Sequence, residues 1–92
     1  MIRSFGDRET EKFWESETSR RLAGIERVAL RKLIKLHAAE ALDDLKVPPG
    51  NRLEALSGSR SGQFSIRINR QWRICFRWSQ GNAFDVEIVD YH

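Results

Sequence analysis

The feature that most constrains the fold of this 92-residue chain is a change in the spacing of its apolar residues at Pro48-Pro49-Gly50. Before this point apolar residues recur every three or four positions, which is typical of amphipathic helices. After it they alternate with polar residues, which is typical of half-buried strands. A helical half followed by a strand half predicts an α+β fold. Because a chain of this length supports one hydrophobic core, we expect a single domain over residues 1–92.

Two helices and a shorter helical segment are predicted in the first half. A short strand at 2–5 comes first, and Asp7 is then placed to cap a helix that carries Phe13. The longest stripe at helical spacing consists of Leu22, Ile25, Ala29, Leu33 and Leu36. Leu42 and Leu45 predict one further short segment, which ends before the prolines because a residue ahead of proline disfavours the helical conformation.

Three strands are predicted in the second half, at 64–68, 72–78 and 84–89, where apolar residues alternate with mostly polar ones. Short connections make them an antiparallel meander, and residues 53–56 are a candidate fourth strand. The expected fold is therefore a short N-terminal strand and two or three helices, packed on one face of a C-terminal antiparallel sheet of three to four strands. The other face of the sheet is left to solvent or to a ligand.

The register of the last hairpin predicts which residues meet on that open face. The register that keeps apolar residues together pairs Trp78 with Phe84, Phe76 with Val86 and Ile74 with Ile88. Tyr91 then lies opposite Gln71, and Arg73 is its diagonal neighbour at roughly 7–8 Å between backbones. Asp90 has the opposite parity and is expected to point toward the helices.

A tyrosine, a terminal histidine and an arginine that converge suit metal-independent RNA cleavage, in which the ribose 2′-hydroxyl attacks the adjacent phosphorus. His92 could act as acid or base, since the unperturbed pKa of histidine is about 6.5. Arg73 would stabilise the charge on the phosphate, Tyr91 could stack on a base, and Asp90 could orient His92. Position alone, however, favours a terminal histidine at a frayed end over a catalytic one.

Five arginines and no acidic residue lie between positions 60 and 77, namely Arg60, Arg67, Arg70, Arg73 and Arg77. Clustered guanidinium groups bind phosphate oxygens, so these arginines are candidate RNA-binding residues. The alternative is a solvated strand face whose arginines serve solubility. The net charge of +3 does not decide between the two.

Other classes of protein are disfavoured by composition. The chain has no apolar run of membrane-spanning length and no secretory signal, so we expect a cytoplasmic protein without membrane contact. Cys75 is the only cysteine and there are two histidines, His37 and His92, far apart in the sequence. We therefore expect no intrachain disulfide, no metal site and no cofactor.

Five stretches in the second half match a known family in order and spacing. They are PPGNRLE at 48–54, LSG at 56–58, GQFSIR at 62–67, NRQWRICF at 69–76 and VEIVDYH at 86–92. On these stretches the chain resembles the HigB toxins of the RelE/ParE superfamily, also described as plasmid maintenance killer proteins. The RelE-like fold of that superfamily agrees with the α+β fold predicted above.

The resemblance implies the toxin of a type II toxin–antitoxin pair. Such a toxin is a ribosome-dependent endoribonuclease that cleaves mRNA in the decoding site and is neutralised by a HigA-like antitoxin with a helix-turn-helix domain. The pair would bind operator DNA only through the antitoxin. It also implies that Arg73 contacts the scissile phosphate and that Asp90, Tyr91 and His92 form the catalytic end.

The chain departs from some HigB relatives at two positions. Those relatives have a histidine and a lysine where this chain has Glu54 and Ser57. The proton transfer or phosphate binding of those groups cannot be assigned here, so Arg73 and the terminus are expected to carry more of the chemistry. Two other functions remain open, a ParE-like inhibition of DNA gyrase and a non-catalytic module that blocks the ribosome.

Overall fold

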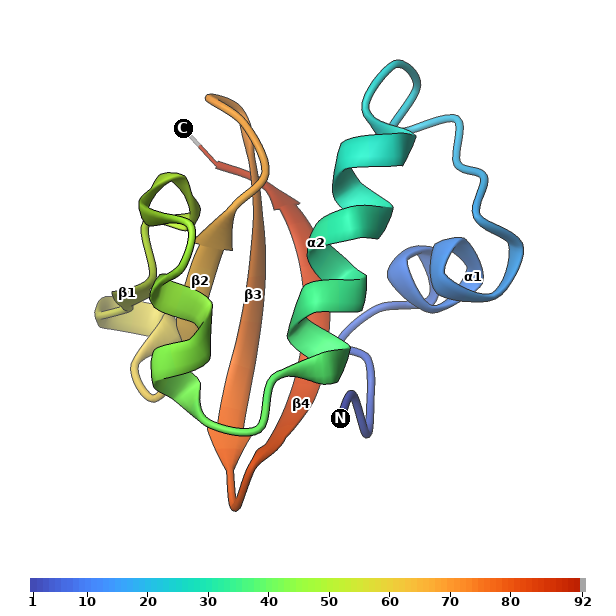
Figure 1. Cartoon of the computed structure of the whole chain (residues 1–92). Helices are drawn as coiled ribbons and strands as arrows, with labels where there is room; N and C mark the ends of the chain where they lie inside the picture. The colour runs from blue at the N-terminus through green and yellow to red at the C-terminus, as the bar shows by residue number, and fades with distance from the viewer. Residues whose placement is uncertain (92) are drawn as a thin grey trace.

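The computed structural model describes residues 1–91, in which two α-helices pack on one side of a four-stranded sheet. The α-helices are α1 (Arg8–Ser16) and α2 (Glu26–Ala38), and the 3-10 helices are η1 (Leu42–Lys46), η2 (Pro49–Asn51) and η3 (Gly58–Arg60). The strands are β1 (Glu54–Ala55), β2 (Phe64–Arg67), β3 (Trp72–Ser79) and β4 (Asn82–Asp90). Figure 1 shows α2 lying across one face of the sheet. The predicted α+β fold is confirmed.

The helices follow the sequence pattern with one difference at the start of α2. The cap of α1 is confirmed, because the Asp7 carboxylate accepts a hydrogen bond of 2.7 Å from the Thr10 N–H. The buried face of α2 consists of Ala29, Leu33 and Leu36. Leu22 and Ile25 share the predicted stripe but precede the helix, although Leu22 is still 1% exposed and part of the core. The predicted third segment is present as the 3-10 helix η1.

The sheet has the strand order β1-β2-β3-β4, with every neighbouring pair antiparallel. β1 confirms the candidate fourth strand, although it is only two residues long. The predicted N-terminal strand is present only as two isolated parallel bridges, which join Ile2 to Ala83 and Phe5 to Val86. These bridges cover the part of the outer edge of β4 that lies nearest the turn, so less of that edge is left open for pairing with another chain.

The register of the β3–β4 hairpin is as predicted toward the terminus and wrong toward the turn. Ile74 lies opposite Ile88 as expected, but Trp78 lies opposite Ala83 and not opposite Phe84. The reason is a β-bulge in β4. Between the pair Cys75 with Glu87 and the pair Arg77 with Phe84, two residues of β4, Asp85 and Val86, lie against Phe76 alone. Asp85 adopts the left-handed backbone that such an insertion uses, with φ of 53°.

The hydrophobic core lies between the helices and one face of the sheet. Its wholly buried members include Phe13, Leu33, Leu36, Leu45, Ile66, Ile74, Phe76, Val86 and Ile88. The backbone of Ile88 is tied to the helical half, because its N–H donates to Thr10 Oγ1 at 3.0 Å and its carbonyl accepts from Arg21 Nη2 at 3.0 Å. Within residues 1–91, no helix is both long and apolar enough to cross a membrane.

Candidate functional site

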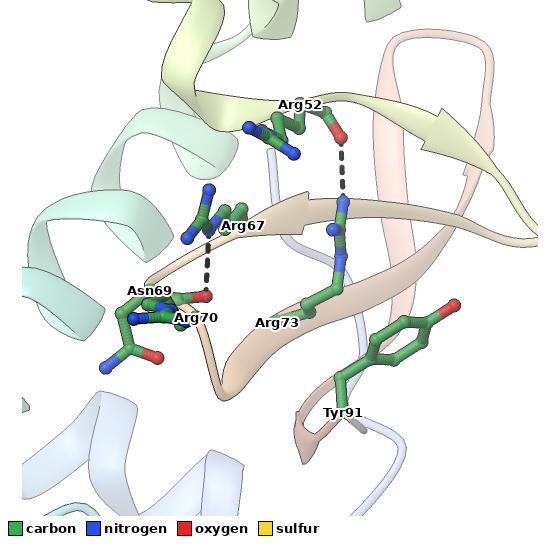
Figure 2. Close-up of a pocket in the computed structure, with 6 residues that line it drawn as sticks. All are labelled: Arg52, Arg67, Asn69, Arg70, Arg73 and Tyr91. Carbon is green, nitrogen blue, oxygen red and sulfur yellow. Dashed lines mark hydrogen bonds between the residues drawn. The ribbon is translucent and has the colours of Figure 1, made fainter.

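The opposite face of the sheet contains a polar pocket of about 280 Å³. Its lining consists of Arg52, Arg67, Asn69, Arg70, Arg73 and Tyr91 (Figure 2). None of these lining residues is acidic, so four guanidinium groups surround a space that is open to solvent. Three arginines and the tyrosine among them are residues that the sequence pattern predicted for RNA binding or catalysis.

Arg73 lies at the centre of this pocket and is held on two sides. Its Nε donates to Ser65 Oγ at 2.8 Å, and its Nη2 donates to the Arg52 carbonyl at 2.7 Å. The residue is only 7% exposed. Arg73 is therefore on the predicted face, but the chain before β1 partly covers it instead of leaving it open. A cation held in this way is already oriented before a ligand arrives.

Arg67 lies directly opposite Arg73 in the β2–β3 ladder. Two like charges in opposing positions destabilise a sheet. The turn that follows Arg67 is fixed by Asn69, whose Oδ1 accepts hydrogen bonds of 2.8 Å from the Gln71 and Trp72 N–H groups. Arg67 Nε in turn donates to the Asn69 carbonyl at 3.0 Å. Two cations thus lie on opposing positions of the ladder, an arrangement that an anion would stabilise.

Arg52 completes the pocket and was not predicted as a site residue. It follows η2 in the left-handed backbone region, with φ of 47°. The preceding Asn51 is fully buried and binds the Leu45 and Val47 carbonyls through Nδ2, at 3.1 and 3.3 Å, while its Oδ1 accepts from Lys32 Nζ. The only sequence signal for Arg52 was its place in the PPGNRLE stretch.

Glu54 brings a carboxylate to the edge of the site. Its Oε1 lies 3.7 Å from Arg73 Nη1, and its side chain is about half exposed. The sheet explains this contact, because Glu54 pairs with Ser65 in the β1–β2 ladder and Ser65 binds Arg73. The sequence marked Glu54 only as a departure from relatives. In the structure its carboxylate lies beside the central cation.

Tyr91 approaches Arg73 as the register predicted. The Tyr91 N–H donates to the Gln71 carbonyl at 2.6 Å, and the Tyr91 ring centroid lies 5.4 Å from the Arg73 guanidinium carbon. Asp90 pairs with Trp72 and accepts from Gln71 Nε2 at 3.1 Å. His92 lies outside the described residues. The catalytic roles of Asp90, Tyr91 and His92 therefore stay predictions.

Two of the predicted RNA-binding arginines do not line the pocket. Arg60 Nη1 lies 2.6 Å from Glu87 Oε1 and also donates to Gln63 Oε1 at 2.9 Å. The hydrogen bond to Glu87 raises the pKa of Arg60. Arg77 Nε lies 3.3 Å from Asp85 Oδ2. Both acidic partners come from β4, which lies outside positions 60–77. A count of acidic residues within that range therefore could not predict these two ion pairs.

Residues able to bind a metal or act as a nucleophile are sparse within residues 1–91. Within residues 1–91, no three His, Cys, Asp or Glu side chains are grouped as a metal ion would need. Cys75 is fully buried on the face of the sheet that carries Arg73, and this burial raises the pKa of its thiol. A neutral buried thiol is a poor nucleophile.

The chain is similar to known proteins along nearly its whole length. Residues 3–92 match the family described as the RelE-like toxin of the type II toxin–antitoxin system HigB. The chain is 44% identical over 87 residues to Toxin HigB-1 of Vibrio cholerae serotype O1, covering 92% of each. It is 39% identical over 41 residues to Endoribonuclease HigB of Proteus vulgaris, covering 45% of each.

The fold is also similar to a solved structure. The YoeB–YefM toxin–antitoxin complex from Staphylococcus aureus contains a chain that superposes with a TM-score of 0.59. The alignment covers 100% of this chain and 98% of that one, at 14% sequence identity. At this identity the likeness concerns the fold alone.

Proposed function

Because this chain belongs to the HigB family of RelE-like toxins from type II toxin–antitoxin systems, as its sequence predicted, we propose that it is an endoribonuclease that cleaves mRNA in the decoding site of the ribosome. The observation that carries the proposal is the pair Arg67 and Arg73, which lie opposite each other in the β2–β3 ladder and line a pocket without acidic lining residues, while the Glu54 carboxylate reaches Arg73 only from the edge. The repulsion between them is relieved by a phosphate. The Tyr91 ring beside them suits an unstacked RNA base.

The reaction that fits this site is an attack of the ribose 2′-oxygen on the adjacent phosphorus. The P–O bond to the 5′-oxygen breaks, which leaves a cyclic phosphate on one fragment and a 5′-hydroxyl on the other. Negative charge grows on the phosphoryl oxygens in the transition state. Arg73 stabilises that charge from a fixed position, because Ser65 and the Arg52 carbonyl already orient its guanidinium. No step is assigned to a metal.

Two proton transfers complete the reaction. The proton of the 2′-hydroxyl goes to a general base, and Glu54 is proposed for that role because its carboxylate lies beside Arg73. The 5′-oxygen takes a proton from a general acid, which we assign to the end formed by Asp90, Tyr91 and His92. Arg52, Arg67 and Arg70 would hold the flanking phosphates of the RNA strand.

The partner of the toxin in this proposal is a HigA-like antitoxin with a helix-turn-helix domain. It neutralises the toxin, and the complex contacts operator DNA through the antitoxin alone. The association of YoeB with YefM in a protein of similar fold supports such a complex. The other partners are the ribosome and its mRNA.

A reconstituted translation system tests the proposal. Purified toxin should cut a defined mRNA in the presence of ribosomes, and Arg73→Ala should slow the cut by about 10²- to 10³-fold. Arg8→Ala, which removes an exposed arginine from α1, should cleave as the wild type does. Blocked translation with intact mRNA would indicate a non-catalytic ribosome inhibitor. Inhibition of gyrase supercoiling in a parallel assay, again with intact mRNA, would indicate a ParE-like function.

A further inference from the structure

The outer face of α2 carries an apolar groove, away from the core. Its volume is about 440 Å³, and its lining consists of Arg31, Lys32, Ile34, Lys35, Ala38 and Pro48. Ile34 is 52% exposed, and Val47, next to Pro48, is 64% exposed. They are two of the four large hydrophobic residues that are exposed in residues 1–91. Exposed apolar side chains that gather in this way mark an interaction surface.

The rim of the groove is positively charged. Arg31, Lys32 and Lys35 line it without an acidic residue. Neither Arg31 nor Lys35 forms an ion pair within residues 1–91. Burial, together with the charges of Arg31 and Lys35, lowers the pKa of Lys32. Asp44 lies in a neighbouring hollow with Lys35, but its carboxylate accepts from the Glu40 and Ala41 N–H groups at 3.0 Å.

The groove lies on the helical side of the sheet, whereas the arginine pocket lies on the other side. A ligand in the groove therefore does not compete with RNA for space. The two sites are nevertheless linked, because Lys32 Nζ donates to Asn51 Oδ1 and Asn51 precedes Arg52. The Arg52 carbonyl in turn holds Arg73. Lys32 thus contacts the chain segment whose carbonyl orients the central cation.

We propose that this groove is the docking surface for an acidic amphipathic segment of the antitoxin. An apolar side chain of that segment would lie among Ile34, Ala38 and Pro48, and its carboxylates would face Arg31 and Lys35. RNA would match the charge of the rim but not the apolar floor. A second copy of this chain would bring the same positive charge. The inference rests on the proposed function, since it names the surface through which the toxin is neutralised.

The test measures binding of the antitoxin encoded with this toxin, by titration calorimetry. Ile34→Glu and Lys35→Glu should each weaken binding about tenfold or more, because each places a negative charge where an acidic segment docks. Lys12→Glu, the same charge reversal on exposed α1, should bind as the wild type does. Circular dichroism should show all three variants folded, since each side chain is wholly or partly exposed.

The outcomes separate this inference from the proposed function. Free toxin carrying Ile34→Glu or Lys35→Glu should cleave ribosome-bound mRNA at the wild-type rate and resist the antitoxin. Antitoxin binding within twofold of wild type in both variants would overturn the docking surface, even if mRNA cleavage is confirmed. Weaker ribosome binding with unchanged antitoxin binding would overturn it too, by assigning the groove to RNA. Absence of cleavage by the wild type would refute the nuclease alone.

Discussion

Truncation of Arg73 to alanine should weaken both the fold and the reaction. The side chain donates to Ser65 Oγ at 2.8 Å and to the Arg52 carbonyl at 2.7 Å, and it is only 7% exposed. Arg73→Ala removes both hydrogen bonds and leaves the fully buried Ser65 hydroxyl without its arginine partner. It also removes the cation that faces Arg67 across the ladder, which offsets part of the loss.

The size of the effect follows from these contacts. A hydrogen bond to a charged group contributes about 1.5–3 kcal/mol to stability. Two such bonds, reduced by the desolvation of the guanidinium and the relief of repulsion with Arg67, give an expected loss of about 2–4 kcal/mol in the free energy of unfolding. For a domain of this size that lowers Tm by at least about 8 °C. Loss of one group that stabilises charge in the transition state costs about 10²- to 10³-fold in kcat.

Ser65→Ala separates the two effects. It removes the hydrogen bond to Nε but keeps the charge of Arg73, so it should lower stability by about 1–2 kcal/mol and reduce cleavage less than Arg73→Ala does. Thermal unfolding followed by circular dichroism gives the stabilities, and cleavage is compared at a temperature at which all variants are folded. An Arg73→Ala protein as stable as wild type would refute the contribution of the two Arg73 hydrogen bonds to stability. Wild-type cleavage by that protein would refute its role at the phosphate.

Four further changes test other parts of the account. Arg52→Gln keeps the backbone carbonyl but removes a pocket cation, so RNA binding should weaken. The slope of the logarithm of the RNA-binding constant against the logarithm of the salt concentration should fall in magnitude by about one. An unchanged slope would contradict this. Glu54→Gln should lower kcat without weakening RNA binding, because the amide cannot accept the proton, and an unchanged kcat would exclude Glu54 as the base. Thr10→Val removes the acceptor for the Ile88 N–H and should cost about 1–3 kcal/mol in urea unfolding, with cleavage retained. His92→Gln should keep the fold and relieve growth inhibition; persistent inhibition would remove His92 from the mechanism.

The elements of the fold could be predicted because apolar spacing is a local property. The β-bulge could not, since Asp85 fits an alternating pattern as well as an insertion. The position of the bulge determines which of the predicted residue pairs form. The bulge lies between Cys75 and the turn, so the register from Cys75 to the terminus is the one expected from apolar pairing. Tyr91 therefore meets Arg73 as predicted, whereas the pair of Trp78 with Phe84 does not form.

The candidate site was only partly predictable because some of its contacts join distant segments. Arg60 and Arg77 meet acids of β4, which a count along the chain does not show. Arg52 and Glu54 reach Arg73 from the segment around β1, and nothing in their spacing places them over the sheet. The alternation of β3 correctly put Arg73 on the face away from the helices. The burial of Arg73, however, depends on the segment around β1 that covers it.

The most direct test of the central claim maps the 5′ ends of cellular mRNAs after the toxin is expressed. New ends are expected within translated regions, in phase with codons. These ends should disappear when translation is blocked beforehand and when Arg73→Ala replaces the wild type. Intact mRNA in cells whose translation has stopped, or cuts that persist without translation, would contradict a nuclease that acts in the decoding site.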